Sequence, residues 1–310
     1  MIKSARRLMA SAALVSTLFV APAAMAQTNA PVAVASVPQA QGQGPAMWVI
    51  RDADSTIYLF GSFHLLKPTA AWGQAHVDAA FASADEIYFE LTDLDDAQKA
   101  ATLIQQLGLS PERPLSSIMT AEDIAALDTV ARSMGATAQA FDPMRPWLVA
   151  LQLAMVQLAK GGYDPNSGVE KVLMARAAAM GKPMKGFETM EEQLGIMAGI
   201  PEEGQLEMLR SALRELDKSP EEVDRLVNAW LSGDVEAIDE IMVTQMKNDQ
   251  PEAYDAMLTR RNANWTRQIS EILKGSGTTF IAVGAAHLVG ENSVQSMLAA
   301  EGITSERVMH

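Results

Sequence analysis

The chain has 310 residues and a formal net charge of −14, and it contains no cysteine. A chain this acidic repels nucleic acid and anionic lipid, so we expect neither as a partner. The absence of cysteine excludes disulfides, cysteine nucleophiles and thiolate metal sites, which leaves His, Asp and Glu as possible metal ligands. A chain of this length can bury a sizeable core without such cross-links.

Residues 1–26 have the three parts of a secretory signal peptide. Three basic residues precede the apolar run 9–20, and Ala24-Met25-Ala26 supplies the small-x-small pattern of a cleavage site. The alternative is an uncleaved N-terminal anchor, but the apolar run is too short to span a bilayer stably, so no stable membrane span is expected. We therefore expect a periplasmic or secreted protein whose mature chain begins at Gln27.

Residues 27–46 are rich in Ala, Pro, Gln and Gly and carry no charge. This composition predicts a flexible leader outside the fold. Residues 47–310 are predicted to form a single domain, with order beginning near Met47.

The expected strands lie at the two ends of that domain. They cover residues 47–51, 56–61, 86–91, 183–187, 278–284 and 305–309. The pattern of residues 95–274 is almost wholly helical, and its apolar segment 146–160 is short enough to be a buried core helix. The sequence therefore predicts an α/β fold with a mixed central sheet built from both chain ends and a large helical middle layer packed on it.

Two strands end in the same short motif, a glycine followed three residues later by a histidine. The motifs are Gly61-Ser62-Phe63-His64 and Gly284-Ala285-Ala286-His287, and the small alanines of the second make the two unequal. Open α/β sheets place their sites at the carboxyl ends of the strands. If both strands belong to one sheet, we expect the two imidazoles to converge. Ser62 is expected to point away from His64 and to escape activation by it.

Glu90 interrupts the end of another apolar strand. It is either a solvated strand end, as most glutamates are, or a carboxylate in the crevice beside His64. Two neutral imidazoles and one carboxylate form a known open ligand set for a divalent ion.

The predicted helix 251–274 carries Arg261 and Asn262 on the same face as Leu258 and Trp265. A buried arginine needs an acidic or carbonyl partner, so Arg261 is expected to pair with Glu90, Glu188 or a substrate carboxylate. The alternative is a purely structural ion pair under the sheet.

Two further glutamates have ordinary structural explanations. Glu170 begins a helix, where the helix dipole favours a carboxylate, and Glu188 is placed to cap one. The sequence lacks the His-Glu-x-x-His, Gly-x-Ser-x-Gly and phosphate-loop motifs of other enzyme classes.

The chain resembles the TraB/GumN family, which includes the Tiki proteases and is distantly similar to erythromycin esterases. The resemblance covers about residues 48–308. Its anchors are Trp48-Val49-Ile50, Gly61-Ser62-Phe63-His64, Phe89-Glu90-Leu91, Gly181-Lys182-Pro183, Phe187-Glu188-Thr189, Glu192-Gln193, Arg261-Asn262 with Trp265, Val283-Gly284-Ala285-Ala286-His287-Leu288 and Glu306-Arg307-Val308.

The resemblance implies a metal-dependent hydrolase acting on a peptide or amide bond, with His64, Glu90 and His287 as ligands of manganese, cobalt or zinc. Arg261 and Asn262 would support the acid or the developing oxyanion. Two alternatives stay open: a metal-free, esterase-like hydrolase with histidine as general base, and a non-catalytic binding or accessory factor for envelope polymer or conjugation machinery. The substrate is expected to be a peptide or a small molecule.

Overall fold

The structure is a computed structural model that describes residues 37–93, 96–215 and 221–309. The predicted signal peptide and the first part of the predicted leader lie outside the described residues. The described chain begins at Val37, ahead of Met47, where we expected the fold to start. Val37 is buried, and Gln39 forms an isolated bridge with Gly73. The residues just before Met47 therefore pack against the domain.

The strands form one mixed sheet of six, in the order β4-β3-β5-β2-β1-β6. They are β1 (Met47–Arg51), β2 (Ser55–Ser62), β3 (Glu86–Phe89), β4 (Met184–Gly186), β5 (Gly277–Gly284) and β6 (Glu306–Arg307). The strands β2, β3, β4 and β5 run parallel to one another, whereas β1 runs antiparallel to both β2 and β6. The predicted mixed sheet built from both chain ends is confirmed.

The parallel pairing brings four strand ends to one edge of the sheet. Ser62 pairs with Gly284, and Phe89 pairs with both Ala282 and Gly186. The residues that follow β2, β3, β4 and β5 therefore emerge side by side, as at the carboxyl edge of other open α/β sheets.

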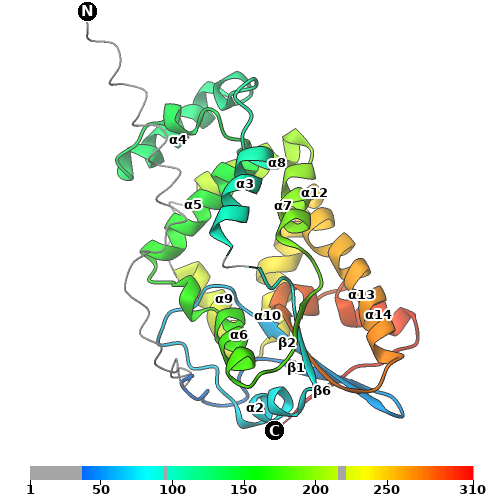
Figure 1. Ribbon diagram of the computed structural model, residues 1–310. Helices are drawn as coiled ribbons and strands as arrows, with labels where there is room; N and C mark the ends of the chain where they lie inside the picture. The colour runs from blue at the N-terminus through cyan, green and yellow to red at the C-terminus, as the bar shows by residue number, and fades with distance from the viewer. Residues whose placement is uncertain (1–36, 94–95, 216–220, 310) are drawn as a thin grey trace, which may run out of the picture.

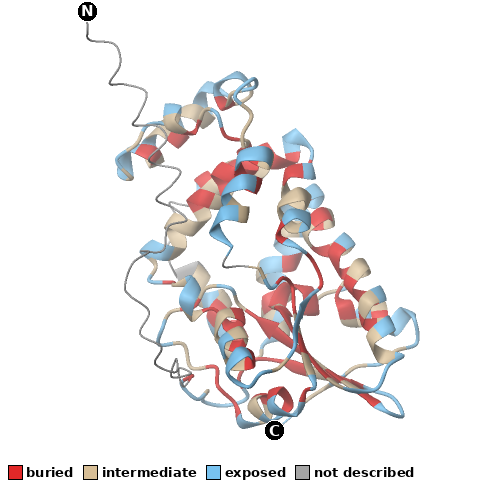
Figure 2. Ribbon diagram, viewed as in Figure 1, coloured by how far each residue is buried: buried red, intermediate tan, exposed pale blue. Residues whose placement is uncertain are grey.

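Helices cover both faces of the sheet (Figure 1). Phe60 and Phe280 face a core shared with α2 (Ala75–Ser83), α6 (Val169–Ala179) and α9 (Glu221–Ser232). Leu59 and Ile281, one residue along each strand, face α13 (Arg260–Leu273) and α14 (Val294–Ala300). This alternation is the period of two expected for buried strands, and Figure 2 shows the strands buried between the helices.

Other helices of the middle region form a lobe with its own core, which lies above the sheet in Figure 1. They are α3 (Ala97–Leu107), α4 (Ala121–Ser133), α5 (Pro146–Lys160), α7 (Met190–Gly199) and α8 (Glu202–Glu215). Trp147, Leu153 and Leu209 are fully buried in this core, so α5 is the core helix that we expected. Within the described ranges, no helix is both long and apolar enough to cross a bilayer.

Two π-helical turns interrupt the helical segment that precedes β5 in the sequence. The first, η4 (Asp239–Thr244), lies between α10 (Val235–Ile238) and α11 (Gln245–Asp249); the second, η5 (Asp255–Thr259), lies between α12 (Pro251–Tyr254) and α13. We expected one uninterrupted helix over 251–274. The short 3₁₀ turns are η1 (Leu115–Ser117), η2 (Ala138–Phe141), η3 (Pro165–Ser167) and η6 (Ala285–Leu288).

Candidate functional site

The candidate site lies at the carboxyl edge of the sheet. Glu90 directly follows β3, His64 stands two residues after β2, and Glu188 stands two residues after β4. His287 lies in η6, the turn that follows β5. Strand pairing alone thus gathers residues that are far apart in the sequence.

The Glu90 carboxylate is held from three sides. Its Oε2 accepts hydrogen bonds from Arg261 Nη2 at 2.6 Å and Gln193 Nε2 at 3.1 Å, and its Oε1 accepts one from the Gly284 backbone N–H at 2.7 Å. Burial raises the pKa of Glu90, but the Arg261 guanidinium, the two histidines and the Gly284 N–H outweigh it and hold the pKa below its usual range. Glu90 is therefore a fixed, ionised carboxylate and not a solvated strand end.

The two Gly-x-x-His motifs need their glycines because neighbouring atoms lie too close to leave room for a side chain. A Cβ on Gly284 would lie 3.1 Å from Glu90 Oε1, and a Cβ on Gly61 would lie 3.2 Å from the Ala285 Cα. The first motif therefore packs against the small alanine of the second, and the second leaves room for the carboxylate. The difference between the two motifs follows from these unequal neighbours.

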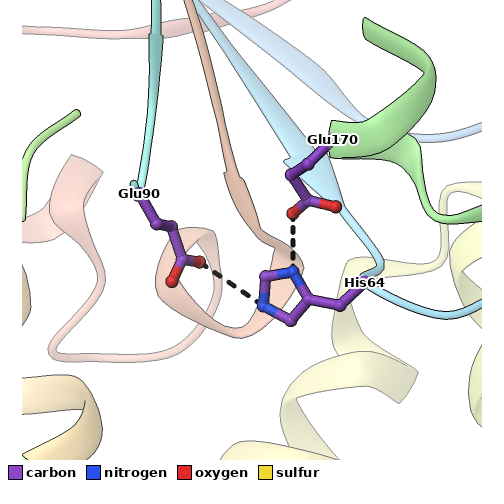
Figure 3. A group of neighbouring side chains, drawn as sticks. All are labelled: His64, Glu90 and Glu170. Atoms are coloured by element: carbon purple, nitrogen blue, oxygen red, sulfur yellow. Dashed lines mark ion pairs between the residues drawn. The ribbon is translucent and has the colours of Figure 1, made fainter. Parts of the chain in front are cut away.

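His64 lies between two carboxylates, as Figure 3 shows. Its Nδ1 is 2.9 Å from Glu170 Oε1, and its Nε2 is 3.8 Å from Glu90 Oε1. Ser62 Oγ donates to the same Glu170 oxygen, so Ser62 is coupled to His64 only through that carboxylate. Glu170 raises the pKa of His64, desolvation by the surrounding protein opposes the rise, and Glu90 adds to it. The side chain is 58% exposed, so this imidazole is open to solvent and ligands.

Glu170 is the functional residue that sequence reasoning undervalued. The residue is 4% exposed, and its Oε2 has no hydrogen-bond partner within the described part of the chain. An unpaired buried carboxylate oxygen is costly, and a bound cation would offset that cost. The signal was available: Glu170 precedes Leu173 by three residues and Ala177 by seven, and both lie on the buried face of α6.

Arg261 links the acid to the helix behind it. Besides Glu90, its guanidinium contacts Glu188 through Nε at 2.9 Å and Nη2 at 2.9 Å, and Trp265 Nε1 donates to the same carboxylate at 3.0 Å. Burial lowers the pKa of Arg261, but Glu90 and Glu188 outweigh it, and the net shift is upward. Arg261 thus pairs with both of the glutamates that we considered, and the sequence-predicted helix face is correct.

His287 has both ring nitrogens engaged. Its Nδ1 is 2.6 Å from Asn262 Oδ1, whose amide donates to the Asn292 carbonyl at 2.7 Å, so Nδ1 carries the proton. Its Nε2 is 3.1 Å from Arg261 Nη1 and 3.9 Å from Glu90 Oε1. Burial first, and Arg261 next, lower the pKa of His287 to about 3. His287 is therefore a neutral imidazole, fixed by Asn262.

The residues that could hold a metal ion are His64, Glu90 and Glu170, whose candidate ligand atoms all lie within 4.8 Å of one another. Our sequence-based set of His64, Glu90 and His287 also converges, since both Nε2 atoms lie within 4 Å of the same Glu90 oxygen. The group found among the described residues contains Glu170 in place of His287, whose ring nitrogens contact Arg261 and Asn262.

The charges of the buried groups are unbalanced. Three carboxylates are buried here, those of Glu90, Glu170 and Glu188, and Arg261 contributes one buried positive charge. When His64 is neutral, two negative charges are uncompensated among these four groups. A divalent cation fits that charge, and imidazole and carboxylate groups are both common metal donors.

Two cavities meet at His64 and Glu90. The first has a volume of about 330 Å³, and polar residues including Glu170, Lys171 and Gln193 line it. The second, of about 210 Å³, extends from Arg261 and His287 to a set of apolar residues. A ligand can therefore reach the site from two sides.

Comparison with known proteins gives a family match over nearly the whole domain. A family model described as the TraB/PrgY/gumN family matches residues 46–307. The uncharacterized protein YbaP of Escherichia coli (strain K12) is 23% identical over 254 residues, which cover 82% of this chain and 92% of that protein. An uncharacterized protein of Treponema pallidum (strain Nichols) is 23% identical over 261 residues, which cover 80% of this chain and 78% of that protein. No solved structure is significantly similar to the chain.

Proposed function

The chain belongs to the TraB/PrgY/gumN family, and we propose that it is a metal-dependent hydrolase of peptide or amide bonds that works outside the cytoplasm. The observation that carries this proposal is the buried, unpaired Oε2 of Glu170, in a group with His64 and Glu90 that has the spacing of metal ligands. The proposed site is at the edge of the sheet where both cavities meet.

We assign His64, Glu90 and Glu170 as the residues that hold the ion, with His287 beside them and its Nε2 engaged by Arg261. Glu170 Oε1 accepts from Ser62 and faces His64 Nδ1, which orients the ring and leaves Glu170 Oε2 free as a donor. His287 is neutral, and its Nε2 faces the same Glu90 oxygen as His64 Nε2. A divalent ion bound there would polarise a substrate carbonyl and increase the acidity of a water molecule.

The protein groups around the ligands fix the acid and exclude water from it. Gln193, Arg261 and the Gly284 N–H keep Glu90 ionised and oriented. Asn262 sets the tautomer of His287, so that the unprotonated Nε2 faces Arg261 Nη1 and accepts its hydrogen bond. Because these contacts occupy Arg261 and Asn262, they favour support of the acid and the histidine over direct contact with an oxyanion.

Metal content and hydrolysis test the proposal together. The purified protein should bind one equivalent of manganese, cobalt or zinc and should cleave members of a peptide library, as detected by mass spectrometry. A chelator should abolish cleavage, and the added metal should restore it. His64→Ala should lose both properties, whereas His76→Ala, in α2 and outside the site, should keep both. Cleavage that survives chelation would favour a metal-free mechanism, and metal binding without any cleavage would favour a binding role.

A further inference from the structure

A pocket with a largely apolar lining adjoins the candidate site and shares His64 and Glu90 with the cavity that Lys171 and Gln193 line. Its apolar lining comes from Phe63, Leu258 and three methionines, namely Met242, Met246 and Met257. The neighbouring cavity differs in its charged and polar residues Glu170, Lys171 and Gln193, which the methionine-lined pocket lacks. A chain molecule lying across His64 and Glu90 would place its neighbouring groups in two different environments.

We propose that this methionine pocket binds an apolar side chain next to the bond that is cleaved, so that the substrates are peptides with a large aliphatic residue at that position. This inference rests on the proposed hydrolase function and assigns it a substrate class. A pocket of about 210 Å³ suits a single side chain, since sites for whole small-molecule ligands are typically about 300–1,000 Å³.

The methionines reach the pocket from an unusual part of the backbone. Met242 lies in the π turn η4, Met257 lies in the π turn η5, and Met246 follows in α11. π turns are rare, and they occur often at functional sites. The Met257 carbonyl also accepts a hydrogen bond from Arg261 Nη1 at 3.2 Å, which ties the second π turn to the acid that Arg261 holds.

The chemistry of the lining favours an aliphatic guest. Methionine side chains are unbranched and polarisable, and they adapt to apolar groups of irregular shape. Met242 is 41% exposed, although it lies beside a highly charged site. An apolar guest would cover it, whereas a charged guest would lose its hydration without gaining a partner among the methionines. Burial of a leucine-sized side chain should give about a 10-fold to 100-fold preference over a small polar one.

Methionine-methyl NMR tests the pocket separately from catalysis. The protein would carry ¹³C-methyl methionine, with the three pocket signals assigned by single Met→Leu variants. Two peptides are titrated, Ala-Ala-Leu-Ala-Ala and Ala-Ala-Ser-Ala-Ala, with and without zinc, and cleavage of both is measured in parallel. The leucine peptide should shift the three pocket signals at about 10-fold lower concentration than the serine peptide. Met257→Ser should weaken leucine-peptide binding about 10-fold at unchanged metal stoichiometry, whereas Met180→Ser, on the exposed end of α6, should change neither.

The outcomes separate the pocket from the proposed function. Pocket signals that respond to the leucine peptide without cleavage of any peptide would support the pocket and overturn the hydrolase. Cleavage of both peptides at equal rates, with equal or absent methyl shifts, would overturn the pocket and leave the hydrolase standing. Absence of both cleavage and methyl shifts would overturn both.

Discussion

Arg261 Nη2 lies 2.6 Å from Glu90 Oε2, although 171 residues separate them in the sequence. The same nitrogen lies 2.9 Å from Glu188 Oε2, so one guanidinium joins the ends of β3 and β4 to α13. A pair buried this deeply holds the edge of the sheet together as well as orienting the acid.

Removal of that guanidinium should therefore destabilise the protein. Arg261→Ala leaves two buried carboxylates without their cation, and breaking a buried pair in this way costs about 3–5 kcal/mol. Arg260 is the matched control, because its side chain is 75% exposed and its pair with Asp255 lies at the surface. Arg260→Ala should change the free energy of unfolding by less than about 0.5 kcal/mol. Equal denaturant midpoints for the two variants would contradict the assigned role.

Replacement of Glu170 tests the candidate metal site without removing a side chain. Glu170→Gln keeps the size of the residue but removes its charge, and we expect the affinity for manganese to fall at least 10-fold, as for lost outer-shell partners. Glu271→Gln, an exposed change on α13, should leave the affinity unchanged. Isothermal titration calorimetry measures both. A manganese affinity for Glu170→Gln equal to that of the parent would show that Glu170 neither holds the ion nor orients His64.

Metal binding should release a proton from His64. Glu170 and Glu90 raise the pKa of His64, so the imidazole of the metal-free protein is protonated at neutral pH, and an ion must displace that proton. Manganese affinity should therefore rise between pH 6 and 8, approaching 10-fold for each pH unit while His64 stays protonated. Calorimetry in buffers of different ionisation enthalpy counts the proton directly. Proton release that stays the same in His64→Ala would assign it to another group.

We predict that the site does not tolerate a methyl group at Gly284, the glycine of the second Gly-x-x-His motif. In Gly284→Ala, the new Cβ would press on Glu90 Oε1, which cannot retreat without losing Arg261. We expect weaker metal binding in a protein that still folds, as measured by calorimetry and circular dichroism. Gly195→Ala is the control, because nothing lies within 4 Å of its added Cβ in α7. That change should stabilise the helix by about 0.5–1 kcal/mol.

The proposed location has a direct test. If residues 1–26 are a cleaved signal peptide, the intact mass of the natively produced protein should correspond to a chain that begins at Gln27. The protein should also be recovered outside the cytoplasm. A species that retains Met1 would rule out cleavage.

Much of the site could be predicted from local patterns. The two Gly-x-x-His motifs each follow a buried strand, and the spacing of Leu258, Arg261 and Trp265 places the arginine on the inner face of its helix. Both patterns depend on the spacing of residues that are close together in the sequence. Such spacing determines which face of a helix or strand a residue occupies, whatever the rest of the chain does. The sheet was predictable for the same reason, because its strands are apolar runs with clear ends.

Other features depend on contacts that no local pattern records. Glu170 has a sufficient local explanation at a helix start, and this explanation concealed its contacts with Ser62 and His64. The π turns depend on a backbone hydrogen bond shifted by one residue, for which these segments have no distinctive composition. The engagement of His287 by Asn262 and Arg261 requires the final positions of η6 and α13 together.

The pairing of β2 with β5 has a consequence for how the protein matures. His64 is synthesised early, but Gly284, whose N–H orients Glu90, belongs to a strand near the end of the chain. Until β5 has been synthesised the sheet lacks one of its central strands, so the acid and the histidine cannot be set in place before that point. Any ion held by these residues would therefore be captured only after β2 and β5 have paired.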